Sequence, residues 1–213
     1  MTQRVWLFDL DNTLHDANPH IFPRMSRAML DYVAEKVGCD ETAAQQLRDE
    51  YWRRYGATLT GLVRHHGVDP HDFLARTHDF LDALPQMVVH EKALTHALAK
   101  LPGRKILFSN APRRYVEAVL DHLSVRRLFD SLWTIERLRF VPKPHLAAFR
   151  QLLRAERLDP RRCIFVEDSA ANLLPAKRLG MKTVLVADAV RAPAYVDVLV
   201  KSVLDLPRLG LTR

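Results

Sequence analysis

The sequence predicts an α/β protein: a doubly wound parallel β-sheet with an all-helical block inserted close to the N-terminus. From residue 86 onward, short apolar runs alternate with amphipathic helical segments, a pattern typical of parallel strands linked by helices. Between residues 18 and 84, by contrast, only helical periodicity is found. We therefore expect a core formed by residues 1–16 and 86–213, and a helical domain at residues 17–85.

The strands expected in the core are apolar runs that end at polar residues. The first run, at residues 5–8, is apolar throughout, as in a strand buried on both faces. Further strands are expected at residues 105–108, 132–135, 163–166 and 183–186, with one more in the tail at 195–199. Helices are expected at residues 91–100, 113–123, after 144, at 173–179 and near 203–206. Right-handed crossovers would place the carboxyl ends of all these strands on one edge.

The inserted block contains the start and stop signals of successive helices. Each expected helix begins at a capping residue or at a proline in its first turn, and two of them end near a glycine, Gly38 or Gly56. The expected starts are Pro23, Asp40, Thr58 or Thr60, and Asp69 with Pro70. The last of these helices is expected to carry Phe73, Leu74, Phe80 and Leu81 on its apolar face.

Composition and charge narrow the classes of function. The 213 residues carry a net charge of +7, but the basic residues occur as pairs interleaved with acids. No zinc-finger, basic-zipper or aromatic RNA-binding pattern accompanies them, which favours a solvated surface or a small anionic substrate over nucleic acid. No apolar run approaches the roughly 20 residues of a membrane span. Two distant cysteines, Cys39 and Cys163, and no secretory pattern lead us to expect a cytoplasmic protein.

Two carboxylates and a hydroxyl, those of Asp9, Asp11 and Thr13, follow the first strand. Because residues two apart on an extended segment point the same way, Asp9 and Asp11 should leave the strand together, where open α/β sheets bind ligands. Crowded acids need a cation, and hard oxygen ligands suit Mg²⁺. Beside a metal, one Asp can attack as a nucleophile while the other donates and accepts protons. The alternative interpretation is a simple turn, which Asp and Asn also favour.

Polar residues end two later strands as well. Ser109 and Asn110 follow one strand, Glu167 and Asp168 follow another, and Lys143 precedes a proline at a loop-to-helix entry. A parallel sheet can bring these groups and the first acids into one crevice. Carboxylates hold a cation, whereas a hydroxyl, backbone amides and a lysine hold a multiply charged anion. Phosphoryl transfer, which depends mostly on positioning and charge neutralisation, needs this set of groups.

The same residues resemble the four motifs of the haloacid dehalogenase-like hydrolases. The sequence DLDNTL at residues 9–14 is similar to motif I, FSN at 108–110 to motif II, KP at 143–144 to motif III and VEDS at 166–169 to motif IV. One such match is weak, but four in the family's order, each at the expected place, are specific. The resemblance implies a Rossmann-like core with a helical cap inserted after motif I, which agrees with the block at residues 17–85.

The resemblance implies a role for each acid. Asp9 would attack phosphorus and form an aspartyl-phosphate. Asp11 would protonate the leaving alkoxide and then deprotonate the water that hydrolyses the intermediate. Mg²⁺ would be bound by Asp9, by Asp168 and by the carbonyl oxygen of Asp11. Glu167 would contact the metal through water or support its ligands.

The remaining residues would hold the phosphate or orient the acids. In the resemblance, Ser109 and the Asn110 amide grip the phosphate, and Lys143 neutralises charge on Asp9 and on the phosphoryl group. Thr13 and Asn172 would orient the acids and the metal-bound water.

Asp11 also separates the subclasses of this family. Its dehalogenases do not need a general acid two residues after the nucleophile, because halide leaves unprotonated, whereas an alkoxide leaves badly without a proton. Asp11 therefore favours a phosphatase. Residues 8–23, Asn110 with Ala111, and the spacing from Glu167 to Asn172 are similar to the pyrimidine 5'-nucleotidase branch, which implies a nucleoside monophosphate such as UMP or CMP as substrate.

Several alternatives stay open from the sequence. The chain could instead be a sugar-phosphate or phosphoglycolate phosphatase, a phosphoglucomutase-like phosphotransferase, or a catalytically idle binding protein. The intact acids and Lys143 disfavour the idle reading. Histidines of the helical block could indicate a second metal, but without tight spacing or cysteines they read as surface residues. The polar cap residues that would select the leaving group are Arg24, Tyr51, Arg54, His65 and His66.

Overall fold

The computed structural model describes residues 4–211, whose contacts divide them into two compact units. The first unit is formed by the described residues up to Asp16 together with those from Val88 onward, and the second is Ala17–Met87. The strands of the first unit are β1 (Val5–Phe8), β2 (Arg104–Phe108), β3 (Ser131–Trp133), β4 (Cys163–Glu167), β5 (Lys182–Val186) and β6 (Val198–Val200). Its helices are α6 (Lys92–Lys100), α7 (Arg113–His122), α8 (Leu146–Ala155) and α9 (Ala170–Arg178), with 3-10 turns η2 (Arg126–Leu128), η3 (Pro160–Arg162) and η4 (Val203–Arg208).

Within residues 4–211 these strands form a six-stranded sheet in the order β3-β2-β1-β4-β5-β6, and every neighbouring pair is parallel. The prediction of a doubly wound parallel sheet is therefore confirmed. β1 lies in the middle, and its register aligns Phe8 with Leu107 of β2 and with Val166 of β4. The residues that follow these three strands consequently emerge side by side at one edge. In sheets of this order, that edge holds the ligand crevice.

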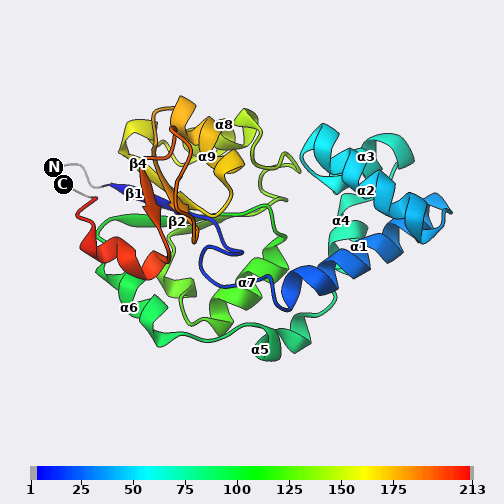
Figure 1. The fold of residues 1–213 in the computed structure, drawn as a ribbon, viewed down its shortest axis with the longest axis horizontal. Helices are drawn as coiled ribbons and strands as arrows, with labels where there is room; N and C mark the ends of the chain where they lie inside the picture. The colour runs from blue at the N-terminus through cyan, green and yellow to red at the C-terminus, as the bar shows by residue number, and fades with distance from the viewer. Residues whose placement is uncertain (1–3, 212–213) are drawn as a thin grey trace. The chain divides into compact units, whose positions relative to one another are not determined.

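Helices cover both faces of the sheet. α8 and α9 lie on one face, and α6 and α7 on the other (Figure 1). Alternate residues of β1 explain the two layers: Leu7 packs in the core cluster with Phe149 of α8, whereas Phe8 meets Phe129 edge to face at 6.0 Å. Because both faces are buried, β1 must be apolar throughout, which is the pattern that the sequence contains at residues 5–8.

The second unit is helical throughout its described residues. It consists of α1 (Ile21–Val37), α2 (Glu41–Tyr55), α3 (Thr58–His66), α4 (Pro70–Thr77), the 3-10 turn η1 (Leu81–Ala83) and α5 (Leu84–Met87). Two of the expected caps form: the Asp40 carboxylate accepts the backbone N–H of Ala43 at 2.8 Å, and Asp69 accepts that of His71 at 2.9 Å. The cap expected at Thr58 or Thr60 does not form, because the N-cap residue of α3 is Ala57, whose side chain cannot accept a hydrogen bond. α2 and α3 pack closely at Gly61, where a Cβ atom would lie 2.1 Å from Cγ of Tyr51.

Some expected boundaries were wrong. The strand expected at residues 132–135 ends at Trp133, because the backbone N–H of Ile135 bonds to the Ala111 carbonyl instead of continuing the ladder. The fourth cap helix ends at Thr77, so Phe80 and Leu81 belong to a separate turn. α1 begins before Pro23, at Ile21, and the closing helix is of the 3-10 type.

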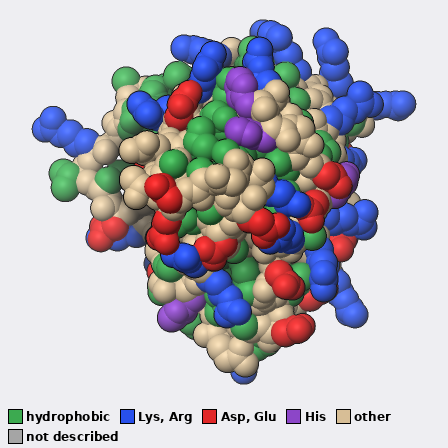
Figure 2. Space-filling view, turned by 90° about the vertical axis from the view of Figure 1, so that its right-hand side faces the viewer, with side chains coloured by type: hydrophobic (Ala, Val, Ile, Leu, Met, Phe, Trp, Pro, Cys, Tyr) green, Lys and Arg blue, Asp and Glu red, His purple; other side chains and the backbone are tan. Residues whose placement is uncertain are grey.

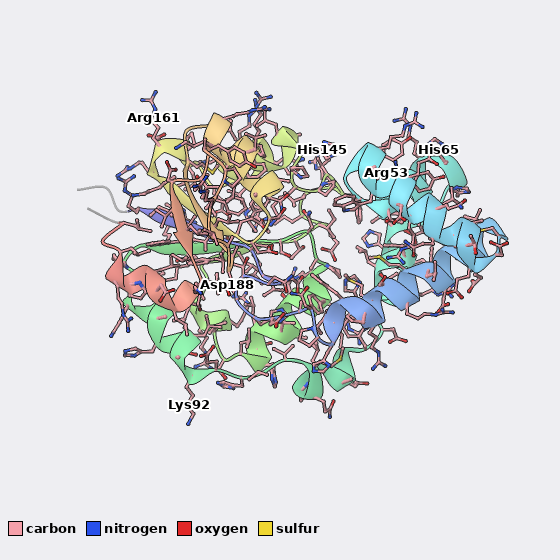
Figure 3. All side chains as sticks on the ribbon, viewed as in Figure 1. Arg53, His65, Lys92, His145, Arg161 and Asp188 are labelled. Carbon is pink, nitrogen blue, oxygen red and sulfur yellow. The ribbon has the colours of Figure 1, made fainter. Side chains whose placement is uncertain are left out.

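The basic residues are spread over the surface. On the face shown in Figure 2, Lys and Arg side chains are interspersed with Asp and Glu. Arg53 on α2, Lys92 at the start of α6 and Arg161 in η3 each project outward from their own element (Figure 3). In residues 4–211, no helix combines the length and the apolar character that crossing a membrane requires.

Candidate active site

The polar residues predicted from the sequence gather at the carboxyl edge of the sheet. Asp9 follows β1 and its backbone N–H bonds to the Val166 carbonyl at 3.0 Å. Ser109 follows β2, and its N–H bonds to the Trp133 carbonyl at 2.9 Å. Glu167 is the last residue of β4. These backbone bonds extend the ladders past the strand ends, so the side chains that follow are held by the sheet itself.

Lys143 connects the ends of β1 and β4. Its ammonium donates to Asp9 Oδ1 at 2.8 Å and to Glu167 Oε2 at 2.7 Å. The side chains of Lys143 and Glu167 are each 1% exposed, so this ion pair is shielded from water, and the Asp9 side chain is 11% exposed. The Lys143 ammonium also lies 5.2 Å from the ring centre of Phe108 and 5.4 Å from that of Phe165. Lys143 is therefore a buried group of the site and not a surface lysine.

The backbone of Lys143 is held by Asn110. The side-chain amide of Asn110 donates to the Lys143 carbonyl at 3.0 Å, and its oxygen accepts the Lys143 N–H at 2.8 Å. These two hydrogen bonds join the end of β2 to the loop that carries Lys143. Such a pair fixes both position and orientation of that loop, which is how a residue 33 positions away in sequence is aligned with Asp9.

The electrostatics of the cluster are those of crowded acids. Burial, with the nearby charge of Glu167, raises the pKa of Asp9 to about 7 although Lys143 opposes the shift. Burial likewise raises the pKa of Glu167 and of Asp168. Burial acts to lower the pKa of Lys143, but the charges of Asp9 and Glu167 outweigh it and raise that pKa. One ammonium cannot balance three carboxylates, so the cluster favours a further cation.

The acidic cluster fits a divalent metal ion. Ligand oxygens of Asp9, Glu167 and Asp168 all lie within 4.8 Å of one another, and hard carboxylate oxygens are the donors that Mg²⁺ prefers. Glu167 is already engaged, since Oε2 accepts from Lys143 and Oε1 accepts the Ser169 N–H at 3.1 Å. This leaves Asp9 and Asp168 as the carboxylates best placed to bind a cation directly.

The Asp11 carboxylate is not a member of that cluster. Its Oδ1 accepts the Tyr115 hydroxyl at 2.5 Å and is 3.0 Å from Nε2 of His15. Burial first, and then the charge of Asp11, raise the pKa of Tyr115, so its hydroxyl stays protonated and donates. Sequence reasoning missed both partners. His15 was signalled only by standing four residues after Asp11, and Tyr115 had the spacing of a core residue on its helix.

The other expected site residues, Ser109, Thr13 and Asn172, differ in the hydrogen bonds that their side chains make. Ser109 is buried, and its hydroxyl oxygen accepts the Ala111 N–H at 3.1 Å at the end of β2. Thr13 is also buried, and its hydroxyl oxygen has no hydrogen-bond partner within residues 4–211. Asn172 lies in the first turn of α9, with its backbone N–H on the Ser169 carbonyl. Its side chain makes no hydrogen bond to the acidic cluster in the described part of the chain.

A profile of the haloacid dehalogenase-like hydrolases matches residues 4–180, a range that includes every site residue described in the preceding paragraphs. The chain belongs to this hydrolase family. The resemblance carried by its four motifs is thus confirmed at the level of the family, whereas the pyrimidine 5'-nucleotidase branch stays a prediction.

Curated relatives of this hydrolase are distant. It is 24% identical to phosphate metabolism protein 8 of Saccharomyces cerevisiae over 86% of its own length, and it spans 61% of that protein. It is 26% identical to phosphoglycolate phosphatase 1 of Pseudomonas aeruginosa, with 84% of this chain and 67% of the relative covered. It is also 26% identical to hexitol phosphatase B of Escherichia coli, with 94% and 92% covered.

The fold is shared with solved structures. A phosphatase of the same family from Thermococcus onnurineus superposes with a TM-score of 0.71 at 19% identity, covering 99% of both chains. At this identity the likeness establishes the fold alone.

Proposed function

We propose that this hydrolase is a Mg²⁺-dependent phosphomonoesterase that works through an aspartyl-phosphate on Asp9. The observation that carries the proposal is the position of the Asp9 carboxylate, which is held at the sheet edge by the buried Lys143 ammonium 2.8 Å away. A carboxylate in this position is oriented, and its charge is partly balanced, before a phosphate arrives. The same ammonium can neutralise charge on the phosphoryl group as it transfers.

The chemistry follows in two steps. Asp9 attacks phosphorus, so that an O–P bond to the enzyme forms while the bond to the leaving oxygen breaks, and Asp11 gives its proton to that oxygen. Asp11 then takes a proton from water, which attacks the aspartyl-phosphate, releases inorganic phosphate and restores Asp9. Ser109 and the backbone N–H of Asn110 would hold the phosphate oxygens during both steps.

Asp9, Asp168 and the Asp11 carbonyl oxygen are the groups that would hold Mg²⁺. When bound, the ion supplies positive charge that keeps the carboxylates ionised and balances the phosphate oxygens. Without a cation, burial holds the pKa of Asp9 at about 7, which would leave part of the nucleophile protonated at neutral pH. Glu167 would support the site by holding Lys143 rather than by binding the ion. The donor set supports magnesium as the cofactor.

The substrate is proposed to be a small phosphorylated metabolite. Phosphoglycolate phosphatase and hexitol phosphatase among the relatives support a sugar phosphate, a polyol phosphate or phosphoglycolate more than a nucleotide. Asp11 supports a phosphate ester over a haloacid, since only the alkoxide needs a proton. The competing candidate is a nucleoside monophosphate, which the similarity to the pyrimidine 5'-nucleotidase branch implies, and the assay below includes it.

The test is a panel of phosphate esters assayed for release of inorganic phosphate. Phosphoglycolate, sorbitol 6-phosphate, UMP, CMP and p-nitrophenyl phosphate would be compared with Mg²⁺ and with EDTA. We expect metal-dependent turnover that is fastest with one of the first two compounds. Fastest release from UMP or CMP would restore the nucleotidase prediction, and transfer of the phosphate to a second sugar without its release would indicate a phosphotransferase.

Asp9→Asn tests the nucleophile, with Asp188→Asn as the matched control. Asp188 comes shortly after β5 but is 83% exposed and pairs with Lys201 at 2.7 Å. We expect Asp9→Asn to abolish turnover and Asp188→Asn to retain it. Full activity of Asp9→Asn would exclude the aspartyl-phosphate mechanism. No turnover by the wild type on any ester would favour a catalytically inactive binding protein.

A further inference from the structure

Two buried side chains outside the four motifs converge on one oxygen of Asp11. We infer that Tyr115 and His15 are positioning residues for the proposed proton donor: they occupy Asp11 Oδ1 and leave Oδ2 as the atom that exchanges protons with the substrate and with water. This inference rests on the proposed function, because it assigns an atom to the acid–base steps of that reaction.

The contacts are direct. The Tyr115 hydroxyl donates to Asp11 Oδ1 at 2.5 Å, and Nε2 of His15 lies 3.0 Å from the same oxygen. A carboxylate oxygen has two lone-pair directions, and both are used once it accepts a hydroxyl and an imidazole N–H. A transferable proton on this carboxyl group therefore belongs on Oδ2. The two donors also prevent the carboxylate plane from rotating freely about its χ2 angle.

The backbone is shaped to bring His15 to this place. Asn12 has a φ of 56°, in the left-handed region that Asn tolerates better than most residues. The N–H groups of Thr13 and Leu14 both bond to the Leu10 carbonyl, which completes a tight turn. Asp11 and His15 then pair as an isolated bridge. The chain thus reverses immediately after the acid and returns an imidazole to it.

The cost of burying His15 indicates that the contact matters. Its side chain is 2% exposed, and Nδ1 is buried without a hydrogen-bond partner within residues 4–211. A buried polar atom without a partner destabilises a fold, and the contact of the other ring nitrogen with Asp11 offsets part of that cost. Tyr115 is 1% exposed and is carried by α7, which follows β2, so its hydroxyl comes from a different element.

Proton transfer to a leaving oxygen explains why such positioning is useful. The donor atom must lie within hydrogen-bond reach of that oxygen in the transition state, and a carboxyl group free to rotate would often present the wrong oxygen. A purely structural role is the competing explanation, in which the two hydrogen bonds only tie α7 and the turn to β1. The two explanations differ in how the damage should depend on the leaving group.

The experiment compares esters that differ in leaving-group basicity. Tyr115→Phe would be assayed with p-nitrophenyl phosphate, which releases a weakly basic phenolate, and with phenyl phosphate, whose phenolate is more basic and needs more help from an acid. The measured quantity is kcat/KM, because it covers only the steps up to departure of the phenolate. Hydrolysis of the aspartyl-phosphate, in which Asp11 also acts, therefore does not enter.

We expect kcat/KM for phenyl phosphate to fall about tenfold in Tyr115→Phe and kcat/KM for p-nitrophenyl phosphate to fall less than about twofold. Tyr195→Phe is the matched control, since this ring packs against the core cluster of the same unit. It should change neither value. Equal losses with the two esters, or no loss with either, would overturn the positioning role.

His15 gives a second, independent test. The side-chain amide of Gln can place an N–H close to where Nε2 lies, whereas Leu cannot donate. We expect His15→Gln to retain most of the kcat/KM for phenyl phosphate. His15→Leu should lose kcat/KM for phenyl phosphate while keeping most of its kcat/KM for p-nitrophenyl phosphate. Equal behaviour of Gln and Leu would overturn the role of His15. Lack of turnover by the wild type on every ester would instead refute the proposed function itself, so the two failures are distinguishable.

Discussion

Removing the ammonium of Lys143 is the perturbation with the largest expected effect on stability. The substitution Lys143→Met keeps a side chain of similar length but leaves Asp9 Oδ1 and Glu167 Oε2 without the donor that now lies 2.8 and 2.7 Å away. Glu167 is fully buried and the Asp9 side chain is 11% exposed, so water can replace little of the lost ammonium, and least of all at Glu167. The result is two buried acids with no counter-charge.

The size of the effect follows from that burial. Breaking a buried ion pair by removing one partner costs about 3–5 kcal/mol. For a chain of this length each kcal/mol shifts Tm by about 2–4 °C, so we expect Tm to fall by roughly 6–20 °C. Burial and neighbouring charge already raise the pKa of Asp9 to about 7, and losing Lys143 raises it further. The cost is therefore present at high pH, where the carboxylates are ionised, and shrinks as the pH falls and they take up protons.

The assay is urea unfolding of metal-free protein in EDTA at pH 8 and at pH 5. Lys105→Met is the matched control, because the Lys105 ammonium is also buried but, within residues 4–211, donates to two backbone carbonyls, those of Leu101 at 2.7 Å and Gly103 at 3.3 Å, and to no carboxylate. Its loss should cost about 1–2 kcal/mol at either pH. The double variant Lys143→Met/Glu167→Gln should recover part of the stability, since one stranded acid becomes neutral.

Three results would contradict this reasoning. The first is equal stability of Lys143→Met and wild type at pH 8, the second is the same loss of free energy at pH 5 as at pH 8, and the third is further destabilisation of Lys143→Met by Glu167→Gln. Any of these would mean that the ion pairs seen in the structure do not govern the stability of the site.

Further predictions concern Asn110, Asp9 and Gly61. Asn110→Ala removes both hydrogen bonds to the Lys143 backbone and should lower kcat at least about tenfold, measured with p-nitrophenyl phosphate; an unchanged kcat would exclude this positioning role. In metal-free protein Asp9 should contribute a loss of stability as the pH rises from about 4 to 7, because folded Asp9 has a pKa of about 7 against a usual 3.8 and so binds a proton that the unfolded chain has released. In thermal melts Asp9→Asn should therefore gain stability relative to wild type as the pH rises through this range, and a pH-independent difference between the two proteins would contradict the raised pKa. Gly61→Ala should destabilise the protein by about 1–3 kcal/mol in unfolding experiments despite the better helix propensity of Ala, because its Cβ would lie 2.1 Å from Tyr51 Cγ, whereas Thr60→Ala in the same helix should have little effect.

Local signals in the sequence determined the kinds of element and the family. The apolar run at residues 5–8 predicted a strand covered on both faces, which the structure confirms, and Asp40 and Asp69 cap helices as their positions indicated. The order of four short motifs was sufficient to predict the hydrolase family, because each motif is a contiguous stretch that keeps its own pattern. Boundaries were less predictable, as at residues 132–135, because competing hydrogen bonds from other segments decide where a ladder stops.

The tertiary structure alone decided which atoms meet. Tyr115 occupies a helix position that reads as apolar, yet packing places its hydroxyl on an acid 104 residues earlier in the chain. The link from Asn110 to Lys143 and the pairing of Lys143 with Glu167 likewise join separate segments. Periodicity reports only which side of its own element a residue faces, so such partners cannot be read from it. They depend on strand order, register and helix packing, which the whole chain fixes together.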